Sequence, residues 1–327
     1  MSEQYTYEVA RIRAMEPALF SNAVIEQLIG TENYESALRF LEEKGWGKAG
    51  TAANGDAMLK AEEEKMWKTM GDLHLDKDVF ALLTMPQLFH NVKCAIKEAV
   101  AGTDVRLPQG ALIYYEETEP NQAEIRSLIE KKEFDSLPVS MQEPAREAYT
   151  RMLRTGDAQI VDIIMDRACL DTMYAIGQAS KASVIREYTE SYVAIKDIGI
   201  AVRAAKVGKN RTFLENSLAP CRTVDKADLI RAASSGLAAL KDYLLTTSYK
   251  DAASYVEASP SAFECWRDNA LLDRLREEKM NPFTIGPVVA YLIARQNEIK
   301  TVRIVLSGKR NGLSAAYIRE RVRNMYV

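Results

Sequence analysis

Residues 299–307 have the sequence Ile-Lys-Thr-Val-Arg-Ile-Val-Leu-Ser, and two earlier stretches share its order of polar and apolar residues. They are Phe-His-Asn-Val-Lys-Cys-Ala-Ile-Lys at 89–97 and Ile-Lys-Asp-Ile-Gly-Ile-Ala-Val-Arg at 195–203. The aligned polar residues are Asn91, Asp197 and Thr301. Their spacings of 106 and 104 residues are each close to a third of the 327-residue chain, which indicates an internal repeat.

Two further landmarks precede each copy in the same order. An aromatic residue stands near the start of each third, and an acidic, helix-prone stretch follows it, at 62–67, 161–166 and 263–268. The aromatic residues are Tyr34, Phe134 and Tyr249. We therefore predict three homologous helical units, at residues 1–109, 110–218 and 219–327. Units that each bury one face must pack on neighbours, so we expect a pseudo-threefold funnel.

Helical periodicity dominates the chain. Apolar residues recur at helical spacing from Tyr34 to Leu41 and stop before Gly45. Asn121–Glu124 has the pattern of a capping box, and Ser314 is expected to be the N-cap of the last helix. One helix is also expected over 225–245. Period-two alternation is nearly absent, and its best example is Leu112–Tyr115. The predicted fold class is all-α.

Composition excludes several classes of protein. The longest apolar stretch without a charge is Thr284–Ala294, well short of the ~20 residues of a membrane-spanning helix. The first thirteen residues show no signal-peptide pattern. The four cysteines form no Cys-x-x-Cys motif, which favours reduced thiols.

No catalytic motif stands out. Gly45–Gly50 matches Gly-x-Gly-x-x-Gly literally, but a helix precedes it where a dinucleotide site needs a strand. The only histidines are His74 and His90, and no His-Glu-x-x-His motif occurs. Asp162 and Asp166 share one face of a helix, where two carboxylates could hold a metal ion. We expect instead that this face is solvated or paired with cations. The pattern favours an assembly protein without a cofactor.

Charge is distributed unevenly along the chain. The first two predicted units carry net charges of −5 and −3, whereas 219–327 carries +5. A basic tail can bind nucleic acid, a membrane surface or an acidic protein. The acidic remainder of the chain argues against a dedicated nucleic-acid binder.

The C-terminal sequence carries a resemblance to a known family. The run from Asn281-Pro-Phe through Ala290-Tyr-Leu, Glu298-Ile-Lys, Gly308-Lys and Asn311-Gly-Leu resembles the closing signature of the C subunit of the V-type (A/V-type) ATPase/ATP synthase, whose eukaryotic relative is the d subunit. Residues 5–13 and 89–93 match the same family. Residues 196–201 depart from it, because they lack the Asn-x-Lys often found there.

The resemblance implies a non-catalytic socket in the central stalk. Such a protein lies on the cytoplasmic face of the membrane, peripheral to it, and joins the central shaft subunits to the membrane rotor (proteolipid) ring. ATP hydrolysis or synthesis is thereby coupled to H⁺ or Na⁺ transport, and the socket itself binds neither nucleotide nor nucleic acid. We take the basic face as the candidate partner interface. Its residues are Arg203, Lys300, Arg303, Lys309, Arg310, Arg319 and Arg323.

Two alternatives remain open on the sequence. The chain could be a helical-repeat scaffold of another multisubunit complex, or an all-α enzyme with an unrecognised site. Charge reversal at Arg303, Lys309 and Arg310 is expected to break the shaft–ring connection without loss of helix. Ile304→Glu is expected to unfold the third unit, because an unpaired charge would be buried.

Overall fold

The computed structural model describes residues 5–48, 54–73, 75–101 and 118–327. Within these ranges the chain forms α-helices and short 3-10 helices with no β-strand, which confirms the all-α prediction. The candidate strand Leu112–Tyr115 lies outside the described residues. The chain divides into two compact units: unit 1 comprises Met1–Leu75, Ala182–Tyr188 and Tyr249–Val327, and unit 2 comprises Asp76–Lys181 and Thr189–Ser248. The division at 109 and 218 and the funnel stay predictions.

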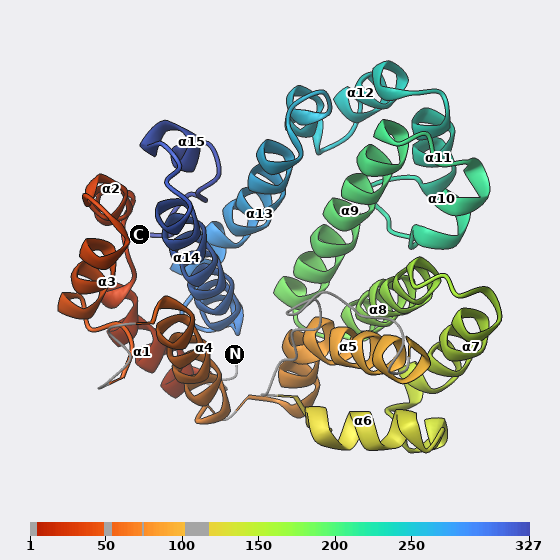
Figure 1. Ribbon diagram of the computed structural model, residues 1–327, viewed down its shortest axis with the longest axis horizontal. Coiled ribbons are helices and arrows are strands. Elements are labelled where there is room, and N and C mark those ends of the chain that lie inside the picture. Colours follow the sequence, from red (N-terminus) through yellow and green to blue (C-terminus); the bar gives the residue numbers. More distant parts are fainter. Residues whose placement is uncertain (1–4, 49–53, 74, 102–117) are drawn as a thin grey trace. The chain divides into compact units, whose positions relative to one another are not determined.

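Unit 1 is built from both ends of the chain (Figure 1). Its elements are α1 (Thr6–Met15), η1 (Glu16–Ala18), α2 (Asn22–Gly30), α3 (Tyr34–Glu43), α4 (Gly55–Gly71), η3 (Lys250–Tyr255), α13 (Pro260–Arg276), η4 (Glu277–Met280), α14 (Gly286–Arg310) and α15 (Ala315–Arg319). The centre of this unit is α14, which packs against α4, α13, α1 and α3. Val288, Val289, Val302 and Val305 on α14 have no exposed surface.

Unit 2 comes from the middle of the chain. Its elements are α5 (Lys77–Ala101), α6 (Gln122–Glu130), η2 (Phe134–Ser136), α7 (Val139–Thr155), α8 (Gln159–Ala179), most of α9 (Ser183–Lys206), α10 (Arg211–Ser217), α11 (Lys226–Ser234) and α12 (Leu237–Leu245). Helices α5, α7 and α8 pack against one another. Gly177 on α8 lies so close to Thr189 on α9 that a Cβ there would overlap the threonine hydroxyl.

Local sequence signals explain where several helices begin and end. The Asn33 side chain caps α3 by accepting a hydrogen bond from the Ser36 N–H (2.9 Å), and Gly45 takes a left-handed φ of 82° after it. The capping box at Asn121 and the N-cap at Ser314 are both formed. These predictions are confirmed.

The expected single helix at 225–245 is wrong. The chain forms α11 and α12 there, with a break at Ser235 and Gly236. Gly236 has φ of 106°, a conformation that the interior of a helix does not allow and that glycine adopts readily. The apolar spacing continues across the break, because both short helices bury leucines. Periodicity alone therefore gave one helix where the glycine makes two.

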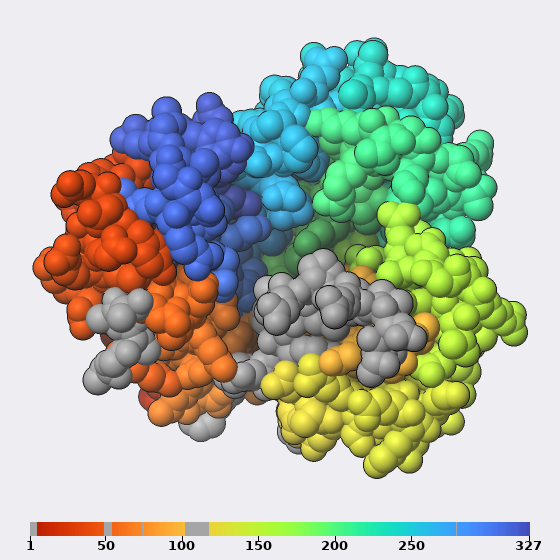
Figure 2. Space-filling view, viewed as in Figure 1, coloured from red at the N-terminus to blue at the C-terminus, as the bar shows by residue number. Residues whose placement is uncertain are grey.

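The two ends of the chain have complementary charge. Residues 1–75 carry a net charge of −5 and residues 249–327 carry +4. Figure 2 shows the red and orange atoms of the N-terminal part directly against the dark blue atoms of the C-terminal part. Much of the basic character of the last third is therefore neutralised inside unit 1.

Candidate partner interface

The polar residue shared by the three sequence copies is buried in each of them. The three residues lie on the long helices α5, α9 and α14, which have 25, 24 and 25 residues. Their exposed fractions are 0% for Asn91, 2% for Asp197 and 0% for Thr301. A buried polar group in the middle of a helix needs a hydrogen-bond partner, and each of the three has one.

The three partners occupy similar places in the chain. Asn91 Nδ2 donates to Thr118 Oγ1 (2.9 Å), the Ala219 N–H donates to Asp197 Oδ1 (3.2 Å), and the Arg323 N–H donates to Thr301 Oγ1 (3.2 Å). The partners follow the landmark residues by 27, 22 and 22 positions. Each long helix is thus tied at the same point to the segment that follows it, which supports the internal repeat.

The acidic landmarks pair with cations on long helices. Lys97 Nζ on α5 lies 2.7 Å and 2.8 Å from the two carboxylate oxygens of Asp162 on α8, and Lys93 pairs with Asp166. Arg303 on α14 donates to Glu63 on α4 (2.8 Å). The face of Asp162 and Asp166 is therefore salt-paired, as expected. The described residues contain no group of three metal-ligating side chains.

A buried ion network fixes α14 within unit 1. Arg295 pairs with Glu62 on α4 and with Glu298 one turn along α14, and the side chains of both glutamates are at most 3% exposed. The Phe20 N–H donates to Glu298 Oε1 (2.7 Å), and the Arg295 guanidinium stacks over Trp46 at 4.9 Å. Burial raises the pKa of Glu298. Glu62 also pairs with Lys65 at 2.6 Å, but Arg295 is the cation that pairs with Glu298, so its removal would leave Glu298 as a buried carboxylate without that ion pair. The network therefore serves stability.

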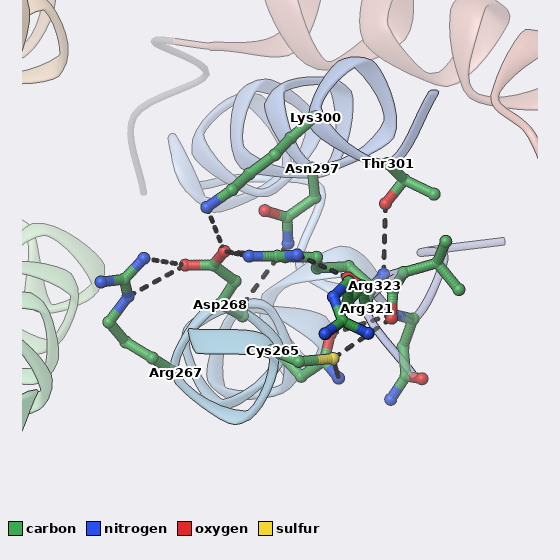
Figure 3. A network of polar contacts seen from close by, with 11 residues as sticks. Cys265, Arg267, Asp268, Asn297, Lys300, Thr301, Arg321 and Arg323 are labelled. Carbon is green, nitrogen blue, oxygen red and sulfur yellow. Dashed lines mark hydrogen bonds and ion pairs between the residues drawn. The ribbon is translucent and has the colours of Figure 1, made fainter. Parts of the chain in front are cut away.

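A second polar network joins α13, α14 and the C-terminal segment (Figure 3). Asp268 on α13 accepts hydrogen bonds from Arg267 Nε and Nη2 at Oδ1, both at 3.1 Å, and from Arg323 Nε at Oδ2 (2.9 Å). Lys300 on α14 donates to the same Oδ2. Burial opposes ionisation of Asp268, but the three cations outweigh it and lower its pKa to about 2.

Five of the predicted interface residues pair with a carboxylate: three lie at the protein surface, and Lys300 and Arg323 share Asp268. Arg303 pairs with Glu63, Arg310 with Asp56 (3.3 Å), Arg319 with Glu26 (2.9 Å), and Lys300 with Asp268. Surface ion pairs of this kind add little to stability, about 0–1 kcal/mol each. A partner protein can therefore exchange such pairs at low cost.

Lys309 and Arg323 have structural roles. Lys309 Nζ donates to the carbonyl oxygens of Ile29 (2.9 Å) and Thr31, which lie at the C-terminal end of α2 and lack helical partners. The Arg323 side chain is only 4% exposed. Reversal of charge at Lys309 would therefore disturb the fold. A triple reversal that includes Lys309 cannot separate an effect on partner binding from an effect on folding, so that experiment needs other variants.

Arg203 is exposed in the last turn of α9, where a cation is favoured by the helix dipole. Its position is in unit 2, whereas the other six predicted residues belong to unit 1. Whether any of the seven contacts a partner stays a prediction.

Ile304, which we expected in the core, is only half-buried, because α14 turns Val302 and Val305 inward instead. A glutamate at Ile304 could reach water, so the expected unfolding does not follow.

Two arginines central to the site were missed from sequence. The partner of Arg295 on α4 is 233 positions away. Arg267 pairs with its neighbour Asp268, and its role appears only when Lys300 and Arg323 join the same carboxylate. The sequence offered only an indirect indication of these networks. Glu298-Ile-Lys300 belongs to the run that resembles the family, and its two charged residues each pair within one of the networks: Glu298 with Arg295, and Lys300 with Asp268.

The other sequence motifs have ordinary local roles where they are described, whereas Gly50 and His74 lie outside the described residues. Gly45 ends α3, and the Gly47 N–H donates to Glu62 Oε1 (2.7 Å). His90 lies 3.4 Å from the Cys94 sulfur on the same helix. None of the described helices is both long and apolar enough to cross a membrane.

The fold and the ion networks define an all-α protein in which charged residues join elements far apart in the sequence. Comparison with known families places it further: residues 9–321 match the ATP synthase (C/AC39) subunit family, and the chain belongs to that family.

Individual relatives are distant but cover nearly the whole chain. The C subunit of the V-type sodium ATPase of Enterococcus hirae is 22% identical over 96% of this chain and 97% of its own length. The C subunit of the A-type ATP synthase of Halorubrum lacusprofundi is 25% identical over 94% of both chains. The corresponding A-type ATP synthase protein of a Desulfurococcus strain is 22% identical over 97% of this chain and 90% of its own.

Proposed function

We propose that this chain is the non-catalytic socket that joins the central shaft subunits of a rotary ATPase to its membrane rotor ring. The family match over residues 9–321 is the observation that carries the proposal. The chain would lie on the cytoplasmic face of the membrane, held there through the ring, and would link ATP hydrolysis or synthesis to H⁺ or Na⁺ transport.

The contacts inside each unit suit a part that transmits torque. The long helix α14 is fixed by the buried pairs of Arg295 and by the hydrogen bond that the Arg323 N–H donates to Thr301. Helix α5 is fixed to α8 by lysine–aspartate ion pairs. Close-packed interiors deform little under load. Helices locked at several points along their length therefore resist shear between neighbouring elements.

Pairwise binding tests this function. The purified chain is mixed separately with purified shaft subunits and with detergent-solubilised rotor ring, and complexes are detected by size-exclusion chromatography with light scattering. We expect a stoichiometric complex in both mixtures. Binding to neither would contradict the proposal and favour a scaffold of another multisubunit complex.

A further inference from the structure

The network around Asp268 contains more positive than negative charge. Three cations donate to this one carboxylate: Arg267, Lys300 and Arg323. The side chains of Asp268 and Arg267 are only 13% and 15% exposed, so solvent screens the charges at this point poorly. A half-buried surplus of cations is unfavourable unless an anion joins it.

Arg323 alone is sufficient to neutralise Asp268. It is the most buried of the three cations, and both Nε and Nη2 lie 2.9 Å from Asp268 Oδ2. Its backbone N–H also bonds to Thr301, so its position is fixed by the fold. The charges of Arg267 and Lys300 are therefore the surplus.

The two surplus cations have donors for a second acceptor. The Lys300 side chain is 40% exposed, and its ammonium carries three hydrogens. Arg267 uses Nε and Nη2 on Asp268, which leaves Nη1 of its fork. Burial and the neighbouring arginines lower the pKa of Lys300, although Asp268 acts against them. A bound carboxylate would relieve this repulsion.

The other basic residues of the candidate interface in unit 1 show no such surplus. Arg303, Arg310 and Arg319 each pair with a carboxylate of their own, and Lys309 is held by two carbonyl oxygens. Electrostatic complementarity gives orientation and association rate to an interface. Among these residues, only the cations around Asp268 outnumber their carboxylate partners. An incoming anion can therefore pair with a cation there without displacing a carboxylate.

We propose that Lys300 and Arg267 together bind a carboxylate side chain from an acidic segment of the central shaft. This inference rests on the proposed function, since it assigns the shaft contact to one pair of residues. An arginine fork and a lysine ammonium converging on one carboxylate form charge-assisted hydrogen bonds, which are about twice as strong as neutral ones.

Titration of the full-length chain with purified shaft subunits tests the assignment at low and high salt. The double variant Arg267→Gln/Lys300→Gln keeps Arg323 on Asp268 and removes only the surplus. We expect at least about a tenfold loss of affinity at low salt and a flatter salt dependence, because the lost interaction is ionic.

Two control variants separate this effect from a general loss of charge. Lys300→Arg keeps the cation and should bind within about threefold of the wild type. Arg231→Gln removes an exposed arginine on α11 that pairs with Asp228 at 2.6 Å, and it should also bind like the wild type. Far-UV circular dichroism checks folding. If the double variant does not fold, the single variant Lys300→Gln replaces it, with an expected loss of at least about threefold.

The outcomes distinguish the two proposals. If the wild type binds the shaft and the folded glutamine variant binds equally well, the assignment to Lys300 and Arg267 is overturned while the socket function stands. If the wild type does not bind the shaft at any salt concentration, the proposed function itself fails.

Discussion

Asp197 is the residue that distinguishes the middle sequence copy from the other two. Asn91 and Thr301 are neutral at the equivalent position, whereas Asp197 carries a carboxyl group with 2% exposure. Burial is the main cause that raises its pKa to about 8, against the opposing effects of the Ala219 N–H, Arg167 and Lys226; Asp171 acts with burial. Below this pH the folded protein holds Asp197 in its neutral form.

Stability should consequently depend on pH through this one group. The unfolded chain ionises Asp197 above its ordinary pKa of 3.8, whereas the folded chain does so only near pH 8. The contribution of Asp197 to stability is therefore complete below about pH 4 and is lost as pH rises to about 8.

The variant Asp197→Asn should remove this loss. We expect the stability of the variant relative to the wild type to rise by more than about 1 kcal/mol between pH 5 and pH 9, measured as the free energy of urea unfolding. The amide oxygen can still accept the Ala219 N–H bond. Equal differences between variant and wild type at the two pH values would contradict the buried-carboxyl account.

Helices α8 and α9 approach each other closely at one glycine. Gly177 allows the α8 backbone to lie against Thr189 on α9, and an added methyl group would overlap the threonine side chain. Gly177→Ala should therefore destabilise the protein by about 1–3 kcal/mol, even though alanine favours helix more than glycine does. Chemical denaturation measures the change.

A second glycine provides the matched control for this prediction. Gly71 at the end of α4 has nothing within 4 Å of an added Cβ, so Gly71→Ala should be neutral or slightly stabilising. If Gly177→Ala were as stable as Gly71→Ala, the close helix approach would not hold in solution.

The sequence predicted that the helices exist and where several of them begin, but it did not predict which charged side chains pair with one another. Capping at Asn121 and Ser314 depends on residues at most three positions apart, so local reading succeeds. The pair Arg303–Glu63 joins residues 240 positions apart, and no local pattern indicates it. For this reason the net charge of the last third predicts a larger docking face than the structure leaves, because several of its cations pair with carboxylates of the N-terminal part.

At the scale of the whole molecule, the two ends of the chain carry opposite net charge and pack into one unit. The acidic first 75 residues and the basic last 79 share the buried network of Arg295 and the Asp56, Glu26 and Glu63 pairs. The candidate interface that remains is therefore smaller than the sequence indicated. It centres on the surplus cations Lys300 and Arg267.

The central claim is that this chain physically connects shaft to ring, and a bridging assay tests it most directly. Rotor ring is reconstituted into liposomes, purified shaft subunits are added with or without the chain, and the shaft protein that co-sediments with the vesicles is quantified. We predict stoichiometric co-sedimentation of the shaft only when the chain is present. Equal recovery of the shaft on the vesicles without the chain would contradict the account.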